Sequence, residues 1–131
     1  MMSMVRFRTS QGVFLAPTER VLEVRKATDM KQLPGAKDGV AGLIERNGHA
    51  LTVLSTFGNR GEHVLLLDAK GASFGLIADE VFGVVNVSEL EIEPAPAGQS
   101  KPLLSGVVRA RAGLELMVSV ESIWREFQKD A

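Results

Sequence analysis

The stretch of this sequence closest to a catalytic motif is Gly71-Ala72-Ser73-Phe74-Gly75, which satisfies G-x-S-x-G. In α/β-hydrolases this pattern presents a nucleophilic serine, and it needs a strand before it, a helix after it and a large parallel sheet beneath it. Here a strand-like segment follows Ser73, and both histidines, His49 and His63, precede it, whereas the hydrolase order places histidine last. We predict a hairpin turn at this stretch and keep a hydrolase that uses Ser73 as an alternative.

The other residues suited to metal binding or proton transfer do not form a recognisable site. His49 and His63 lie fourteen positions apart, without the spacing typical of metal ligands. Asp79 and Glu80 are adjacent carboxylates, which can divide acid and base roles, but the end of a solvated strand explains them as well. The chain has no cysteine, which excludes disulfides and thiol chemistry. We therefore expect no catalytic residue, no metal and no cofactor.

The length and charge of the chain limit the partners that it can bind. Its 131 residues suit one domain, expected to span 1–131. Fifteen Lys and Arg residues against 16 Asp and Glu give a formal net charge of −1, so no overall field favours nucleic acid or an anionic membrane. No signal-peptide region and no apolar run of membrane-spanning length is present. A cytoplasmic protein without membrane insertion is expected.

Four arginines alternate with apolar neighbours and could form one basic patch for an acidic partner. Arg6 and Arg8 lie in the first strand-like segment, and Arg109 and Arg111 lie in the last hairpin. If both segments belong to one subdomain, the four guanidiniums share a region of the surface. The alternative is an ordinary solvated face, partly neutralised by Glu115 or Glu91.

Alternating apolar and polar residues predict many short strands and few helices. The clearest hairpin surrounds Asn47 and Gly48, since both tolerate the positive φ that a type I′ turn requires. Pro17 and Thr18 can open one helical turn, with Thr18 as its N-cap. Residues 93–102 contain three prolines and are expected to be an extended connection. The predicted strands are 5–9, 13–15, 21–24, 42–46, 50–54, 64–67, 74–78, 84–87, 106–111 and 114–120.

The chain also resembles itself at an offset of about 60 residues. Phe14 matches Phe74 at an offset of 60, and the segment 40–44 matches 104–108 at an offset of 64. Two copies of one β-unit, about 5–58 and 64–120, would each be too small to be stable alone and should share a core.

We therefore predict an all-β fold of two small β-barrel-like subdomains that ends in a short helix over about 121–129. In that helix Ile123, Trp124 and Phe127 share one face. Aliphatic residues dominate the apolar composition, and five apolar residues are candidates either for the core or for a patch that meets a partner. They are Val21, Leu22, Val81, Phe82 and Val84.

The order and spacing of several motifs resemble the CheW-like domain family, the bacterial chemotaxis coupling module. The resemblance covers the chain from about Val5 to Phe127. The motifs are Val5-Arg-Phe-Arg, Gly12-Val-Phe-Leu-Ala-Pro, Arg20-Val-Leu-Glu-Val, Leu33-Pro-Gly, Val40-Ala-Gly-Leu-Ile, Gly75-Leu-Ile-Ala-Asp-Glu-Val, Ile92-Glu-Pro-Ala-Pro and Leu104-Ser-Gly-Val.

The resemblance implies two intertwined five-stranded SH3-like β-barrel subdomains and a non-enzymatic scaffold of two-component signalling. Such a scaffold couples chemoreceptors, the methyl-accepting proteins, to a CheA-type histidine kinase. A groove between the subdomains would take the helical tip of the receptor, and one barrel end would dock the regulatory domain of the kinase.

The resemblance also assigns residues to the receptor groove. Val21, Glu23 and Gly42 correspond by position to receptor contacts of the family, and Asn47 stands where the family has a contacting arginine. An adaptor that binds only receptors, or another signalling protein, and not the kinase is an alternative. From a different class, a small-ligand-binding β-barrel is also kept.

Overall fold

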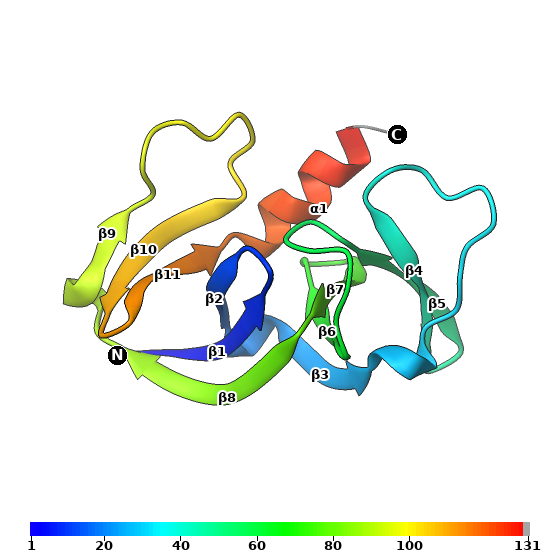
Figure 1. Ribbon diagram of the computed structural model, residues 1–131, viewed down its shortest axis with the longest axis horizontal. Coiled ribbons are helices and arrows are strands. Elements are labelled where there is room, and N and C mark those ends of the chain that lie inside the picture. Colours follow the sequence, from blue (N-terminus) through cyan, green and yellow to red (C-terminus); the bar gives the residue numbers. More distant parts are fainter. Residues whose placement is uncertain (130–131) are drawn as a thin grey trace.

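The computed structural model describes residues 1–129 and consists mainly of strands in two sheets (Figure 1). The first sheet has the order β8-β1-β2-β11-β10-β9 and the second has the order β3-β6-β7-β5-β4. One α-helix, α1 (Val120–Lys129), follows the last strand of this part of the chain. The strands are β1 (Met2–Thr9), β2 (Gly12–Pro17), β3 (Val21–Lys26), β4 (Val40–Arg46), β5 (His49–Leu54), β6 (His63–Asp68), β7 (Ser73–Ala78), β8 (Glu80–Val87), β9 (Ile92–Pro94), β10 (Leu104–Ala110) and β11 (Gly113–Val118).

The predicted all-β class with a short C-terminal helix is confirmed, and each predicted strand overlaps an observed one. The first sheet has a sixth strand, β9, at the start of the segment that was expected to be only an extended connection. Pro94 lies at the end of β9, where the missing N–H of proline costs one hydrogen bond at most.

The helical turn after β2 has a different N-cap from the predicted one. The turn spans Thr18–Arg20, its N-cap is Pro17, and no side chain caps it. The hydroxyl of Thr18 lies 2.8 Å from the hydroxyl of Ser3 instead. The prediction of Thr18 as N-cap was therefore wrong, because the turn begins one residue earlier than the sequence suggested.

Two tight turns use left-handed residues at their tips. Asn47 (φ 51°) and Gly48 (φ 82°) join β4 to β5, as predicted for an Asn-Gly hairpin. Lys70 (φ 55°) and Gly71 (φ 99°) join β6 to β7 in the same way. The G-x-S-x-G stretch is thus a hairpin turn followed by a strand, as predicted, and has no helix after it.

Each of the two predicted repeat segments gives strands to both sheets. In the first sheet β1 pairs with β8, and β2 runs parallel to β11. In the second sheet β3 pairs with β6, and β5 runs parallel to β7. The parallel pair Leu15–Met117 of the first sheet corresponds to the pair Gly75–Val53 of the second. Leu15 and Gly75 are related by the offset of 60, and Val53 and Met117 by the offset of 64. The two sheets are therefore intertwined through equivalent pairings.

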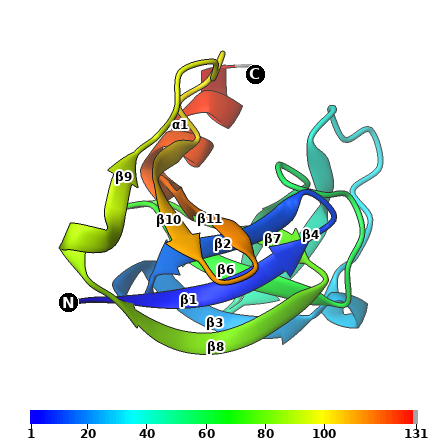
Figure 2. The same ribbon diagram turned by 60° about the vertical axis from the view of Figure 1, so that its left-hand side comes forward.

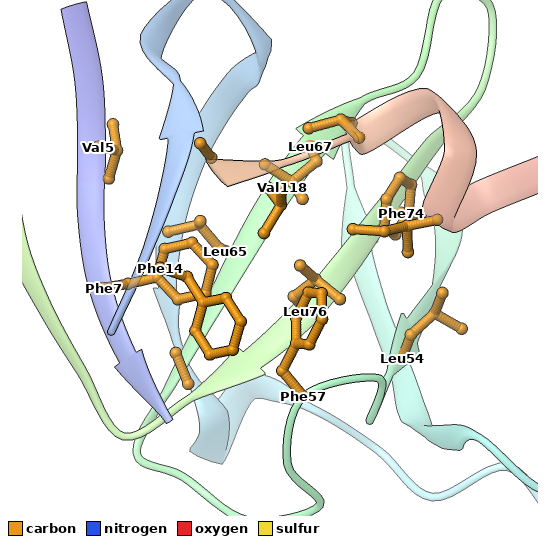
Figure 3. Packing of buried hydrophobic residues seen from close by; sticks show 14 residues of the cluster. Val5, Phe7, Phe14, Leu54, Phe57, Leu65, Leu67, Phe74, Leu76 and Val118 are labelled. Atoms are coloured by element: carbon orange, nitrogen blue, oxygen red, sulfur yellow. The ribbon is translucent and has the colours of Figure 1, made fainter. Parts of the chain in front are cut away.

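The largest buried cluster lies between the two sheets and under α1 (Figure 3). It includes Phe7 and Phe14 from the first sheet, whose rings stack at 5.6 Å, and Phe74 from the second. Burying a side chain of this size contributes about 1.5–3 kcal/mol. Two smaller clusters, one around Leu15 and one around Leu66, fill the inner face of each sheet.

Helix α1 packs over this central cluster and is fixed by contacts at both of its ends. Near its start, Glu121 accepts a hydrogen bond from Arg20 at 2.9 Å. Near its end, the ammonium of Lys37 donates to the carbonyl of Phe127 at 3.1 Å and lies 3.9 Å from the centre of its ring. The turned view shows α1 rising beside β10 and β11 (Figure 2).

Replacing Gly75 with alanine is expected to destabilise the second sheet. An added Cβ would lie 2.8 Å from Val64 Cγ1 and 3.1 Å from Val53 Cγ2, inside a packed cluster. Overpacking of this kind costs about 1–3 kcal/mol of unfolding free energy. Urea denaturation checks the value, with Ser73→Ala on the same strand as the control that should change it by less than about 0.5 kcal/mol. Equal stability of both variants would contradict the packing described here.

Candidate partner-binding surface

Strands β3 and β4 are the two edges of the second sheet, and side chains bridge the seam between them. Arg46 Nε donates to Glu23 Oε2 at 3.0 Å, and Arg25 Nη1 donates to the backbone carbonyl of Glu45 at 3.0 Å. Farther along, Lys31 and Leu43 exchange two backbone hydrogen bonds. The seam is thus closed by polar contacts rather than by a continuous strand ladder.

Two of the four residues assigned to the receptor groove lie near the hairpin end of this seam. Glu23 is half-buried and receives a hydrogen bond from Arg46, the neighbour of Asn47 in the chain. Asn47 itself is exposed at the tip between β4 and β5. The structure therefore brings the acidic side chain and the hairpin tip to one part of the surface.

The other two residues lie deeper. Val21 is half-buried and packs against the central cluster. Gly42 is buried beneath Met30 and Lys31, and a Cβ at this position would lie 2.7 Å from Met30 Cγ. A side chain does not fit there, so Gly42 acts on the surface by letting the loop after β3 pack closely onto β4.

Arg46 is a surface residue that the sequence interpretation missed. Strand alternation separates it from position 47, which made it a poor substitute for the family arginine. Arg46 projects from the same face of β4 as Ile44 and forms an ion pair across the seam with Glu23. Arg25 also approaches Glu23, at 3.5 Å. The shared face of Ile44 and Arg46 could have been read from the sequence, but the closeness of β3 to β4 could not.

Three of the exposed apolar residues lie on β3 and β8, strands that run along the same side of the molecule (Figures 1 and 2). Val24 on β3 is 43% exposed, and Phe82 and Val84 on β8 are 44% and 62% exposed. Val21, Leu22 and Val81, which were the remaining apolar candidates, are half-buried against the clusters. We refer to Val24, Phe82 and Val84 as the apolar strip.

Three of the four arginines of the predicted basic patch lie on strands of the first sheet and have acidic partners, and the fourth, Arg111, lies in the turn between β10 and β11. Arg8 lies 3.5 Å from Asp79, and Arg109 lies 3.4 Å from Glu93. Arg111 is exposed at the tip of the last hairpin. These ion pairs leave less free positive charge than four unpaired guanidiniums would, which agrees with the alternative of a partly neutralised face.

Arg6 has the most enclosed environment of the four. It donates to both carboxylate oxygens of Glu115, at 2.8–3.0 Å, and its guanidinium lies 4.7 Å from the centre of the Phe82 ring. These hydrogen bonds raise the pKa of Arg6 above its usual value, and burial opposes them. The offset-related positions of the second sheet hold leucines instead. Leu66 corresponds to Arg6, Leu51 to Glu115 and Leu22 to Phe82. The first sheet therefore has an ion pair where the second has an apolar contact.

Ser73 and His63, which were weighed for catalysis, lie far apart, and the ring of His63 instead lies 3.2 Å, at Nδ1, from the backbone carbonyl of Asp79. On the paired strands β6 and β7, His63 is opposite Ala78, whereas Ser73 is opposite Asp68 at the other end. Five strand residues separate the two ends, or roughly 17 Å. In residues 1–129 no group of three or more metal-binding side chains is found. Within the same range, no helix has the length and apolar character to span a membrane.

A hollow of about 500 Å³ lies beside Lys26, Glu62 and His63. These residues belong to strand ends and connections, whereas the inner faces of both sheets are filled by side chains. The arrangement gives no support to the alternative of a ligand held inside a barrel.

Known proteins are similar to this chain in sequence and in fold. Residues 3–128 match the family model of the CheW-like domain. The chain is 24% identical to the "Chemotaxis protein CheW" of Rhizobium meliloti, over 98% of this chain and 90% of the relative. It is 30% identical to "Protein PilI" of Pseudomonas aeruginosa, over 79% of this chain and 65% of the relative. A crystal structure of the scaffolding protein TtCheW from Thermoanaerobacter tengcongensis has the same fold, with a TM-score of 0.79 at 21% identity, covering 91% of this chain and 84% of that one.

The Arg6–Glu115 pair is expected to stabilise the first sheet more than an exposed pair would. In a double-mutant cycle with Arg6→Ala and Glu115→Ala, we expect a coupling energy of about 1–2 kcal/mol, because the carboxylate is only 11% exposed. Arg109 and Glu93, with side chains 72% and 52% exposed, provide the matched control, expected below about 0.5 kcal/mol. Denaturation of the unchanged chain and the six variants measures both values, and equal coupling in the two cycles would refute the difference.

Proposed function

Since the chain belongs to the CheW-like domain family, the scaffold proteins of chemotaxis-type signalling, we propose that it is a non-enzymatic adaptor that couples chemoreceptors to a CheA-type histidine kinase. The proposal places it in the cytoplasm, where both partners would meet it. It would act through a coupling free energy between its two bound partner proteins, without forming or breaking a covalent bond.

The observation that carries the proposal is the apolar strip on β3 and β8 together with the polar seam beside it. A helical partner binds by laying an apolar face on exposed apolar residues, while polar groups at the margin fix its position. Val24, Phe82 and Val84 supply the apolar part. Glu23 and Asn47, two of the receptor-groove positions, supply polar groups at the seam, where Glu23 projects from the opposite face of β3 to Val24.

The charged side chains at the seam affect how strongly a receptor helix can bind there. Glu23 is already paired with Arg46 and Arg25 in the free protein. A basic group of the partner would have to compete with these two guanidiniums, whereas an acidic group could share one of them. Asn47 at the tip contributes no charge, so the hairpin offers the receptor one cation fewer than the family pattern.

The second candidate is an adaptor that binds only receptors, or another signalling protein, and not the kinase. The neutral tip at Asn47 and the 30% identity to a relative with a different name, "Protein PilI", favour divergence from the chemotaxis coupling proteins. The two candidates differ in one measurable property, which is whether the kinase regulatory domain binds.

The first test is paired co-elution of the full chain with a receptor signalling fragment and, separately, with the regulatory domain of a CheA-type kinase. Coupling requires both complexes, so both are expected to elute earlier than the free proteins. Binding to the receptor fragment alone would support the second candidate. Binding to neither would refute the adaptor.

The second test restores the cation at the hairpin tip. Asn47→Arg is expected to tighten binding of the receptor fragment about twofold to fivefold, since one exposed ion pair contributes up to about 1 kcal/mol. Asn59→Arg adds the same charge at an exposed loop position away from this hairpin and serves as the control. Titration calorimetry compares the variants with the unchanged chain. No gain, or the same gain for both, would show that the tip does not contact the receptor.

A further inference from the structure

Phe82, the aromatic member of the apolar strip, lies at a bulge in β8. Along the ladder between β1 and β8, Arg6 is opposite Gly83 and Phe7 is opposite Val81, so Phe82 is an extra residue with no partner on β1. Gly83 has a φ of 108°, which residues with a side chain rarely adopt. A β-bulge redirects side chains and is often found beside a functional site. The bulge therefore helps to decide where the Phe82 ring points.

The second sheet contains the corresponding bulge with a different outcome. On β3, the ladder with β6 skips Leu22 in the same way, and Leu22 is related to Phe82 by the offset of 60. Leu22 is half-buried and packs into the small cluster that contains Leu66 and Leu51. Phe82 is instead 44% exposed. Equivalent bulges thus place one side chain in a cluster and leave the other at the surface.

An ion pair stands where the second sheet has those two leucines. Arg6 corresponds to Leu66, and Glu115 corresponds to Leu51. The guanidinium of Arg6 donates to both carboxylate oxygens of Glu115, at 2.8–3.0 Å, and lies over the Phe82 ring, 4.7 Å from its centre. A cation is attracted to the face of an aromatic ring, but burying that cation completely would be costly. The ring therefore packs against a fixed guanidinium and remains partly exposed.

The stability of the fold does not explain this ion pair. The Glu115 side chain is 11% exposed and that of Arg6 is 30% exposed, so both charges have lost much of their water. Replacing such a pair with apolar residues of similar volume is often neutral or stabilising, whereas removing one partner is costly. The second sheet has leucines at both corresponding positions within an equivalent arrangement of strands. An exposed aromatic ring is what the ion pair provides and the leucines do not.

We propose that Arg6 and Glu115 are positioning residues that hold the Phe82 ring outward on the apolar strip for a helical partner. The inference rests on the proposed function, because it takes the strip as the receptor contact. An aromatic side chain that is already held in place loses less conformational freedom when a partner binds it. The ion pair acts through the ring and does not itself touch the partner.

The position of the ring is tested first in the free protein. The double variant Arg6→Leu/Glu115→Leu gives the first sheet the leucines of the second, so we expect an unchanged or higher urea midpoint and a Phe82 ring that packs inward. A neutral gadolinium chelate broadens NMR signals of exposed groups, and it should broaden the Phe82 ring signals less in this variant. The methyl signals of Val84, 62% exposed on the same strand, are the internal control. Equal broadening of the Phe82 ring in both proteins would overturn the proposal.

Two further double variants separate the ion pair from general effects of substitution. Arg6→Met/Glu115→Gln keeps the approximate shapes and removes both charges, so it should also reduce the broadening of Phe82, and it replaces the leucine variant if that variant does not fold. Arg109→Leu/Glu93→Leu removes an exposed ion pair from the same sheet and should leave the Phe82 signals unchanged. A similar change in all three variants would contradict a specific role for Arg6 and Glu115.

The role in binding is tested by titration calorimetry with the receptor signalling fragment. Phe82→Ala is expected to weaken binding about fivefold or more, because it removes the aromatic contact. Arg6→Leu/Glu115→Leu should weaken binding about twofold to fivefold, since the ring is no longer held in place. In the Phe82→Ala background the two leucines should cause no further loss, because the ion pair acts only through the ring.

The pattern of losses distinguishes this inference from the proposed function. If Phe82→Ala weakens binding and the leucine variant does not, the inference is overturned while the receptor contact stands. If the leucines cause the same loss with and without the Phe82 ring, Arg6 or Glu115 contacts the partner directly and the inference is again overturned. Full affinity of Phe82→Ala would refute the strip as the receptor contact, and this role of the ion pair with it.

Discussion

The exchange of strands between the two halves of the chain is the constraint on which the rest of the structure depends. Neither sheet can form from one half alone, since β1 needs β8 and β3 needs β6. The central cluster then packs residues of both sheets into one core, with Phe14 and Phe74 at offset-related positions. The surfaces described above are consequences of this arrangement, because it leaves β3 and β4 as the edges of the second sheet and sets α1 over the central cluster.

Features that depend on local sequence could be predicted, and features that depend on distant contacts could not. The Asn47–Gly48 turn follows from the φ preferences of two residues, and the all-β class follows from alternation and the internal repeat. The parallel pairing of β2 with β11 joins residues about a hundred positions apart and has no local signal. Local signals also misled at Thr18, where proline and not threonine holds the cap position.

The same division applies to the candidate surfaces. The resemblance assigned Glu23, Asn47 and Gly42 to one groove, and the structure places the first two at the surface near the seam and Gly42 beneath the loop after β3. The partnership of Glu23 with Arg46 could be recognised only once β3 and β4 lay side by side. The contact of Arg6 with the Phe82 ring is likewise a property of packing, because the alternation along β1 and β8 predicts strands but says nothing of the bulge at Phe82.

The strand exchange also bears on how the chain is made. About 70 residues separate the end of β1 from the start of β8, its partner at the sheet edge. At a synthesis rate of about 5–20 residues per second, a ribosome leaves the nascent β1 without that partner for roughly 4–14 seconds. During this interval Val5 and Phe7 are exposed in an incomplete sheet. A new chain of this protein is therefore a natural client for chaperones that shield apolar strands until the second half emerges.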